Sequence, residues 1–272
     1  MPLTLMYITN NPEIALIAEK SGVDWIFVDL EIKGKLERQG HLDTVISHHT
    51  ISDIKPIKKV LTKSKLLVRI NPINEETEQE INEVIDSGAN IIMLPYFKTL
   101  KEVKTFISLI NKRVETCLLL ETPEAVEIID NILEVKGIDY IHIGLNDLHL
   151  GYKMKFMFEL LADGTVEMLC NKIKNKNMKY GFGGIAQLGK GLLPAEYIIT
   201  EHYRLGSTMA ILSRSFCNLK IDNDYNEIKR LFNEGMVNIR NFECYIIDKE
   251  NNYYVNNYQI IKQKVNLIIS KN

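Results

Sequence analysis

Short apolar runs alternate with longer amphipathic segments along most of the chain. Eight runs have the length and near-continuous apolar character of strands that are buried on both faces: residues 3–8, 24–31, 65–70, 89–96, 117–121, 138–144, 179–186 and 207–216. A segment with helical spacing of apolar residues follows each run, at about 12–22, 52–63, 75–88, 99–112, between 121 and 138, at about 156–176, from near 194 and from 224. The pattern therefore predicts eight consecutive strand–helix units.

Eight such units in about 215 residues predict an α/β fold, a (β/α)8 TIM barrel with a C-terminal helical extension. An open doubly wound sheet is the competing fold, but no GxGxxG motif follows the first strand. We assign residues 1–243 to the barrel domain and residues 244–272 to the extension. Within the extension we expect a turn or short hairpin at 248–257. Residues 258–270 should form a helix whose apolar face packs on the barrel or on a neighbouring subunit.

Composition and charge exclude several classes of protein. The chain has 272 residues, of which 46% are hydrophobic and 25% are charged, as in ordinary globular proteins. Its formal net charge of -2 offers no basic surface for nucleic acid. No apolar stretch is long enough to span a membrane, no leader is recognisable, and the four cysteines form no CxxC motif. We therefore expect a cytoplasmic protein that binds neither nucleic acid nor membrane.

Two carboxylates follow neighbouring strands in the middle of the chain. Glu121 comes directly after the run CLLL, and Asp147 lies just past IDYIHIG. Strands joined by one helical segment form a βαβ unit, so both carboxylates should lie at the carboxyl edge of the sheet, where α/β enzymes build their sites. An oxygen pair of this kind suits a hard cation such as Mg²⁺ or Mn²⁺.

Three further charged residues end apolar runs. Asp29 and Glu31 close the second predicted strand, and Arg69 lies near the end of the third. A charge next to a core is expected to be paired, liganded or solvated. Two interpretations stay open: Arg69 neutralises Glu31 or Glu121 in a structural ion pair, or these groups form part of a catalytic rim.

The segment LLLETPEAVEIIDNILEVKGIDYIHIGLNDLHLGY resembles the metal-site segment of the HpcH/HpaI aldolase and citrate lyase β-subunit family. DWIFVDLE, LLVRIN and SGANIIMLP are also similar to that family and occur in the same order, so the resemblance covers roughly residues 10–216. It implies a phosphoenolpyruvate/pyruvate-binding TIM barrel with Mg²⁺ or Mn²⁺ on Glu121 and Asp147. It also implies that Arg69 faces the ketoacid oxygens and that the backbone amides around Asn146 and Asp147 hold the substrate carboxylate.

The chain departs from the aldolase branch at two positions. Ile32 stands where that branch has a histidine that takes part in proton transfer, and Leu119 stands where it often has glutamine. The basic loop 32–50 could supply the missing base, with His41 and His48 as the candidates. A solvated loop without a catalytic role is the alternative. His142 lies inside a strand and is expected to be a satisfied core or inter-helix histidine and not a ligand.

These features together predict a divalent-metal-dependent carbon–carbon lyase or aldolase that acts on a pyruvate-type 2-oxoacid through a metal-stabilised enolate. The predicted catalytic residues are Arg69, Asp29, Glu31, His41 and His48, with Asn146 and Asp147 also binding substrate. Three alternatives stay open: a citrate-lyase-like acyl-CoA ester lyase, a phosphoenolpyruvate-using enzyme and a non-catalytic barrel that binds an oxoacid. The expected partners are a small-molecule oxoacid and further copies of the chain in a homo-oligomer (dimer, trimer or hexamer).

Overall fold

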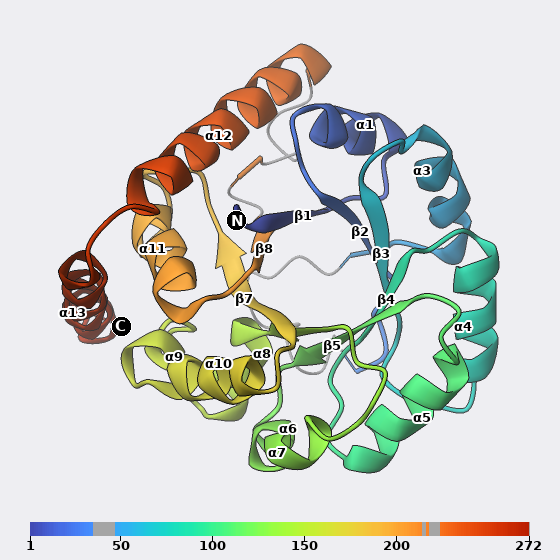
Figure 1. The fold of residues 1–272 in the computed structure, drawn as a ribbon. Helices are drawn as coiled ribbons and strands as arrows, with labels where there is room; N and C mark the ends of the chain where they lie inside the picture. The colour runs from blue at the N-terminus through green and yellow to red at the C-terminus, as the bar shows by residue number, and fades with distance from the viewer. Residues whose placement is uncertain (35–46, 214–215, 218–223, 272) are drawn as a thin grey trace.

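Apolar side chains on both faces of each strand close the sheet into a barrel. The computed structural model describes residues 1–34, 47–213, 216–217 and 224–271, and in it eight parallel strands pair in sequence order around a closed barrel (Figure 1). The strands are β1 (Thr4–Ile8), β2 (Trp25–Asp29), β3 (Lys65–Arg69), β4 (Ile91–Leu94), β5 (Glu115–Leu120), β6 (Tyr140–Ile143), β7 (Lys179–Ile185) and β8 (Met209–Leu212). The prediction of a (β/α)8 TIM barrel is confirmed.

Helices surround the barrel on its outer side (Figure 1). They are α1 (Pro12–Lys20), α3 (Ile54–Val60, after the 3-10 turn Ile51–Asp53), α4 (Thr77–Asp86), α5 (Leu100–Ile110), α6 (Pro123–Glu127), α7 (Ile129–Ile132), α8 (Leu145–Gly151), α9 (Glu159–Ala162), α10 (Thr165–Asn175), α11 (Ala195–Leu205), α12 (Tyr225–Ile246) and α13 (Asn251–Ile269). The helix expected over 156–176 is two helices, because Gly164 adopts a positive φ of 90° between α9 and α10.

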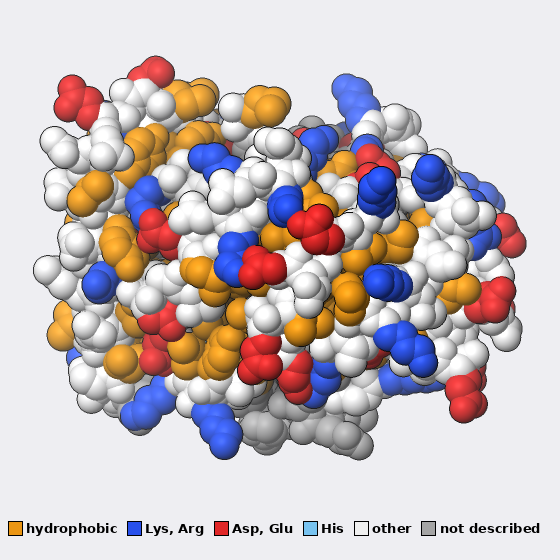
Figure 2. Space-filling model, turned by 60° about the horizontal axis from the view of Figure 1, so that its bottom comes forward, with side chains coloured by type: hydrophobic (Ala, Val, Ile, Leu, Met, Phe, Trp, Pro, Cys, Tyr) orange, Lys and Arg blue, Asp and Glu red, His pale blue; other side chains and the backbone are white. Residues whose placement is uncertain are grey.

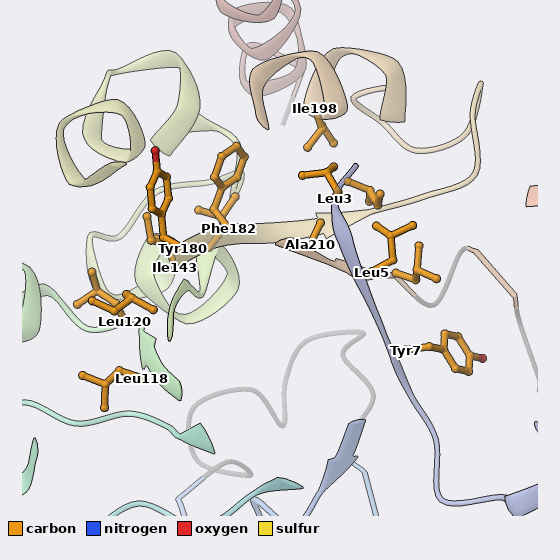
Figure 3. Packing of buried hydrophobic residues seen from close by; sticks show 14 of the residues in the cluster. Leu3, Leu5, Tyr7, Leu118, Leu120, Ile143, Tyr180, Phe182, Ile198 and Ala210 are labelled. Carbon is orange, nitrogen blue, oxygen red and sulfur yellow. The ribbon is translucent and has the colours of Figure 1, made fainter. Parts of the chain in front are cut away.

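The hydrophobic core has two layers that follow from the alternation of side chains along each strand. One cluster fills the barrel interior and includes Phe27, Leu67, Cys117 and Leu119. The other lies between the strands and the surrounding helices. Figure 3 shows part of this outer layer, where Phe182 of β7 and Ile198 of α11 lie among the outward side chains of β1, β7 and β8. Inward positions recur at every second residue of a strand. Those beyond the interior cluster, near the carboxyl end of each strand, therefore lie at the carboxyl rim of the barrel.

The C-terminal extension is helical and packs on its own barrel. Helix α13 contacts α9 and α11, as Figure 1 also shows. Asn257 donates to the Tyr197 carbonyl over 3.0 Å and to Glu201 Oε1 over 2.9 Å, and Tyr258 donates to the Ala162 carbonyl. The prediction of a turn or hairpin at 248–257 is wrong, because α13 already begins at Asn251. Asn257 shares the buried face of α13 with Ile261 and Val265, and a search for apolar spacing misses a buried amide.

The end of the barrel domain and the contact of α13 with a second subunit stay predictions. Helix α12 continues past residue 243 and ends at Ile246. None of the helices in the described part of the chain combines the length and the apolar character needed to cross a bilayer. On the face shown in Figure 2, basic and acidic side chains are interspersed.

Candidate active site

Asp29 and Arg69 form the central ion pair of the carboxyl rim. They are the last residues of β2 and β3 and lie directly opposite each other in the register of these strands. Arg69 Nε donates to Asp29 Oδ1 and Arg69 Nη2 to Asp29 Oδ2, both over 2.8 Å. This bidentate geometry fixes the plane of the guanidinium, which also lies 5.5 Å from the ring centre of Phe27 beneath it. The side chain of Arg69 is 12% exposed and that of Asp29 is 2% exposed.

Glu31 completes this cluster from the segment that follows β2. Its Oε2 lies 3.4 Å from Arg69 Nη1, and its side chain is fully buried. Burial alone would lower the pKa of Arg69, but the charges of Asp29 and Glu31 raise that pKa above its ordinary value. The guanidinium therefore stays charged. The expected contact between Arg69 and Glu31 is present, and Asp29 is an additional and closer partner of Arg69; the catalytic roles of the three residues stay predictions.

Glu121 lies one residue past β5 and is held by the backbone of the preceding strand–helix connection. Its Oε1 accepts the N–H of Tyr96 over 3.0 Å, and Tyr96 has the left-handed φ of 46°. Such a conformation is uncommon for a large side chain and tends to occur at functional sites. A Cβ at Gly144 would lie 2.8 Å from Glu121 Oε2, so a glycine is needed there to make room for the carboxylate.

Asp147 lies in the first turn of α8, immediately after β6. It is 7% exposed, and Asn146 beside it is half-buried. Burial, followed by the negative charges of Glu31 and Asp147, raises the pKa of Glu121 well above its ordinary value, whereas Arg69 and the Tyr96 amide oppose this change. The structure therefore brings Glu31, Glu121, Asp147 and Arg69 into one electrostatic unit, as the positions of the strand ends predict.

This unit is rich in carboxylates. Four carboxylates, those of Asp29, Glu31, Glu121 and Asp147, are buried at this rim, and the guanidinium of Arg69 interacts with the first three. Carboxylate oxygens are the ligands that hard divalent cations prefer, so the donor set of Glu121 and Asp147 fits Mg²⁺ or Mn²⁺. Within the described residues no group of three or more His, Cys, Asp or Glu side chains is arranged to hold a metal ion. The metal site expected on Glu121 and Asp147 therefore stays a prediction.

The structure brings a different histidine to the rim from the two predicted ones. His41 lies outside the described residues, and His48 is exposed. His49 Nδ1 accepts the backbone N–H of Asp29 over 3.0 Å, which places its ring beside the end of β2. His48 and His49 are adjacent in the sequence, and only the path of the chain shows which of the two lies beside Asp29. The roles predicted for His41 and His48 stay predictions.

His142 is a second residue whose surroundings differ from expectation. Its ring faces the barrel interior, where one ring nitrogen, Nε2, lies 3.1 Å from the Gly183 carbonyl oxygen. Its Nδ1 is buried without a hydrogen-bond partner among the described residues, so the expectation of a satisfied core histidine is wrong for this atom. Burial, together with the nearby charge of Arg69, lowers the pKa of His142 to about 4. This imidazole is therefore neutral at physiological pH.

Buried neutral histidines make the stability of the fold sensitive to acid. His202 on α11 stacks on Phe182, and burial lowers its pKa to about 3. As the pH falls below about 6.5, the unfolded chain binds a proton that the folded His202 does not, so the free energy of unfolding falls by about 1.4 kcal/mol per pH unit.

We expect the free energy of unfolding of His202→Phe, which keeps the stacking on Phe182, to rise relative to that of wild type by on the order of 2 kcal/mol between pH 7 and pH 5. Urea denaturation at both pH values measures this, with exposed His48→Phe as the control. A difference between His202→Phe and wild type that does not change with pH would contradict it.

Comparisons with known proteins place these observations in context. The family model described as HpcH/HpaI aldolase/citrate lyase matches residues 3–162. A search of curated proteins found no match.

Similar solved structures include an HpcH/HpaI aldolase from Desulfitobacterium hafniense DCB-2, with a TM-score of 0.61 and 18% identity over 78% of this chain and 86% of that one. An HpcH/HpaI aldolase/citrate lyase family protein from Burkholderia cenocepacia J2315 has a TM-score of 0.64 and 13% identity over 84% and 95% of the two chains. The citrate synthase SbnG has a TM-score of 0.62 and 15% identity over 84% and 94%. At these identities the structural likeness shows the fold alone.

Proposed function

Because the chain belongs to the HpcH/HpaI aldolase/citrate lyase family, we propose that it is a divalent-metal-dependent carbon–carbon lyase or aldolase acting on a pyruvate-type 2-oxoacid. Family membership supports the coarser statement that this is a lyase or aldolase enzyme. The metal and the oxoacid are the finer part of the proposal.

One observation supports the finer part: the buried carboxylates of Glu31, Glu121 and Asp147 and the guanidinium of Arg69 form one electrostatic unit at the carboxyl rim. A barrel selected only for stability has no use for this arrangement, because buried charges cost more free energy than apolar residues of the same size. Carboxylate oxygens are suitable ligands for a divalent cation, and the guanidinium offers hydrogen-bond donors to an anionic substrate. The carboxylates that could bind a cation and the guanidinium that could bind the substrate therefore lie at the same rim.

Each residue has a part in holding the substrate. Asp29 binds Arg69 through both carboxylate oxygens, which fixes the direction of the remaining guanidinium N–H groups. Arg69 then binds the oxoacid oxygens and shares the negative charge that develops when the bond next to the carbonyl breaks. Glu121 and Asp147 would hold Mg²⁺ or Mn²⁺, which when bound supplies Lewis-acid polarisation of the carbonyl. The backbone amides at Asn146 and Asp147, in the first turn of α8, are proposed to bind the substrate carboxylate.

Exchange of the pyruvate methyl hydrogens with heavy water tests the proposal, because it reports enolisation without requiring the second substrate. We expect exchange in the presence of Mg²⁺ or Mn²⁺ and its loss on adding EDTA, followed by NMR of the methyl signal. Intact metal binding without exchange would contradict the pyruvate proposal and favour an oxoacid-binding barrel. Turnover of an acyl-CoA ester or of phosphoenolpyruvate in place of exchange would favour one of the other two alternatives.

A further inference from the structure

The segment that joins β2 to the following loop has a fixed conformation although it has no regular secondary structure. Each backbone N–H from residue 29 to residue 33 donates to a defined acceptor. In order along the chain the acceptors are His49 Nδ1, the Arg69 carbonyl, Asp29 Oδ1 and, for both residues 32 and 33, Asn71 Oδ1. This segment carries Asp29 and Glu31, so its conformation decides where these two carboxylates lie around Arg69.

Asn71 provides two of these five contacts from the connection after β3. Its Oδ1 accepts the N–H groups of Ile32 and Lys33, each over 3.0 Å. Its Nδ2 donates to Glu80 Oε1 of α4 over 2.8 Å, and its backbone N–H lies 3.2 Å from Glu80 Oε2. Asn71 is 8% exposed, so this amide is held on both sides. Since a carboxylate accepts hydrogen bonds and does not donate them, the contact with Glu80 also fixes which side of the Asn71 amide carries the nitrogen.

The Glu80 carboxylate is partly removed from solvent where it binds Asn71. Burial raises the pKa of Glu80 above its ordinary value, although its hydrogen bonds with Asn71 oppose this. Holding a carboxylate in such surroundings costs free energy, and the result is a defined amide orientation two residues from Arg69. A second contact supports the same segment: Lys33 Nζ donates to Asn74 Oδ1 over 2.9 Å.

We propose that Asn71, oriented by Glu80, is a positioning residue that fixes Glu31 against Arg69 by binding the backbone of residues 32 and 33. The inference rests on the proposed function, since the reaction is what requires that geometry. Asn71 does not itself contact the substrate. Shifts of about 1 Å in a catalytic group can cost on the order of 10²-fold in rate, so a distant amide can control turnover.

Exchanging the amide of Asn71 and the carboxylate of Glu80 tests the role of this pair. Asn71→Asp keeps an acceptor for the two N–H groups but sets two carboxylates against each other, and we expect kcat for pyruvate exchange to fall by about 10- to 100-fold with a smaller change in KM. Glu80→Gln alone should have a small effect, because its amide oxygen still accepts from Asn71. The double variant Asn71→Asp/Glu80→Gln restores a donor–acceptor pair and should recover most of the lost kcat. Asn71→Leu should also lower kcat, and adding Glu80→Gln should not restore it, because leucine cannot form the hydrogen bond.

The control is an amide with the same kind of contacts at the opposite end of β3. Asn90 Oδ1 accepts the Leu66 N–H over 2.9 Å and the Lys58 ammonium over 2.9 Å. Asn90→Leu should lower the free energy of unfolding but leave kcat within about twofold of wild type. An Asn71→Asp variant that loses only stability, or a double variant that stays as slow as Asn71→Asp, overturns the proposal.

A readout that does not depend on the reaction separates this inference from the proposed function. The Nε–H resonance of Arg69 in ¹⁵N-labelled protein, assigned by its absence in Arg69→Lys, reports the guanidinium contacts directly. We expect it to shift in Asn71→Asp, to return toward its wild-type position in the double variant and to stay unchanged in Asn90→Leu. If wild type does not exchange pyruvate, the proposed function fails, and this resonance still decides whether Asn71 sets the geometry of the cluster. An unchanged resonance in Asn71→Asp overturns the inference.

Discussion

Arg69→Lys is expected to lower the rate of pyruvate exchange by about 10²–10³-fold, with the barrel still folded. Lysine keeps the positive charge at this position among the carboxylates. It cannot reproduce the two parallel hydrogen bonds to Asp29 or present a planar set of donors to the oxoacid. The initial rate of methyl exchange at saturating metal measures the loss. Circular dichroism and urea denaturation confirm that the variant is folded.

Arg204 provides a matched control on the outer side of the barrel. It lies on α11, is 15% exposed and binds Glu167 through both terminal nitrogens and Glu201 through Nε, so its ion pairs resemble those of Arg69. Arg204→Lys should lower the free energy of unfolding and leave the exchange rate close to that of wild type. Equal losses of activity in the two variants would mean that Arg69 acts through stability, and the proposed catalytic role would then be wrong.

Glu121→Gln is expected to stabilise the metal-free protein at pH 8 and to abolish its response to metal. The folded pKa of Glu121 is raised by burial and by the charges of Glu31 and Asp147, so its contribution to stability is present at low pH and is lost as the pH rises from about 4.5 through the folded pKa. The neutral amide removes this loss and still accepts the Tyr96 N–H. We expect a gain of about 0.5–2 kcal/mol in the free energy of unfolding at pH 8 that shrinks toward pH 5.

The same variant tests the metal directly. Wild type should gain about 2.7 kcal/mol at a metal concentration of 100 times Kd, and Glu121→Gln should gain almost nothing. Thermal unfolding with and without Mn²⁺ measures both. Glu124→Gln is the control, because Glu124 belongs to the same connection but is exposed and pairs with Lys98. A metal response in Glu121→Gln as large as in wild type would contradict the assignment of Glu121 as a ligand.

The fold was predictable because buried positions are occupied by apolar residues at regular spacing in the sequence. Strands covered on both faces read as continuous apolar runs, and all eight were located from these runs. The errors lie where polar residues are buried or where backbone conformation matters. Asn257 lies on the buried face of α13, and Gly164 divides the helix expected over 156–176.

The site was predictable only as far as strand ends locate residues. Asp29, Arg69, Glu121 and Asp147 follow apolar runs, so the sequence placed them on one rim. The contacts that fix them come from residues with no comparable signal. His49, Asn71 and the Tyr96 amide act from irregular segments, whose course depends on the packing of the whole barrel.

The sequence by itself determined the barrel, the rim and the family, because apolar periodicity and the order of short motifs are properties of the chain. Only the tertiary structure decided which partner each charge has. Asp29 rather than Glu121 accepts hydrogen bonds from Nε and Nη2 of the guanidinium, because the register places Asp29 opposite Arg69 on neighbouring strands. Distances between side chains depend on how strands pair and close, and no pattern along a single chain encodes them.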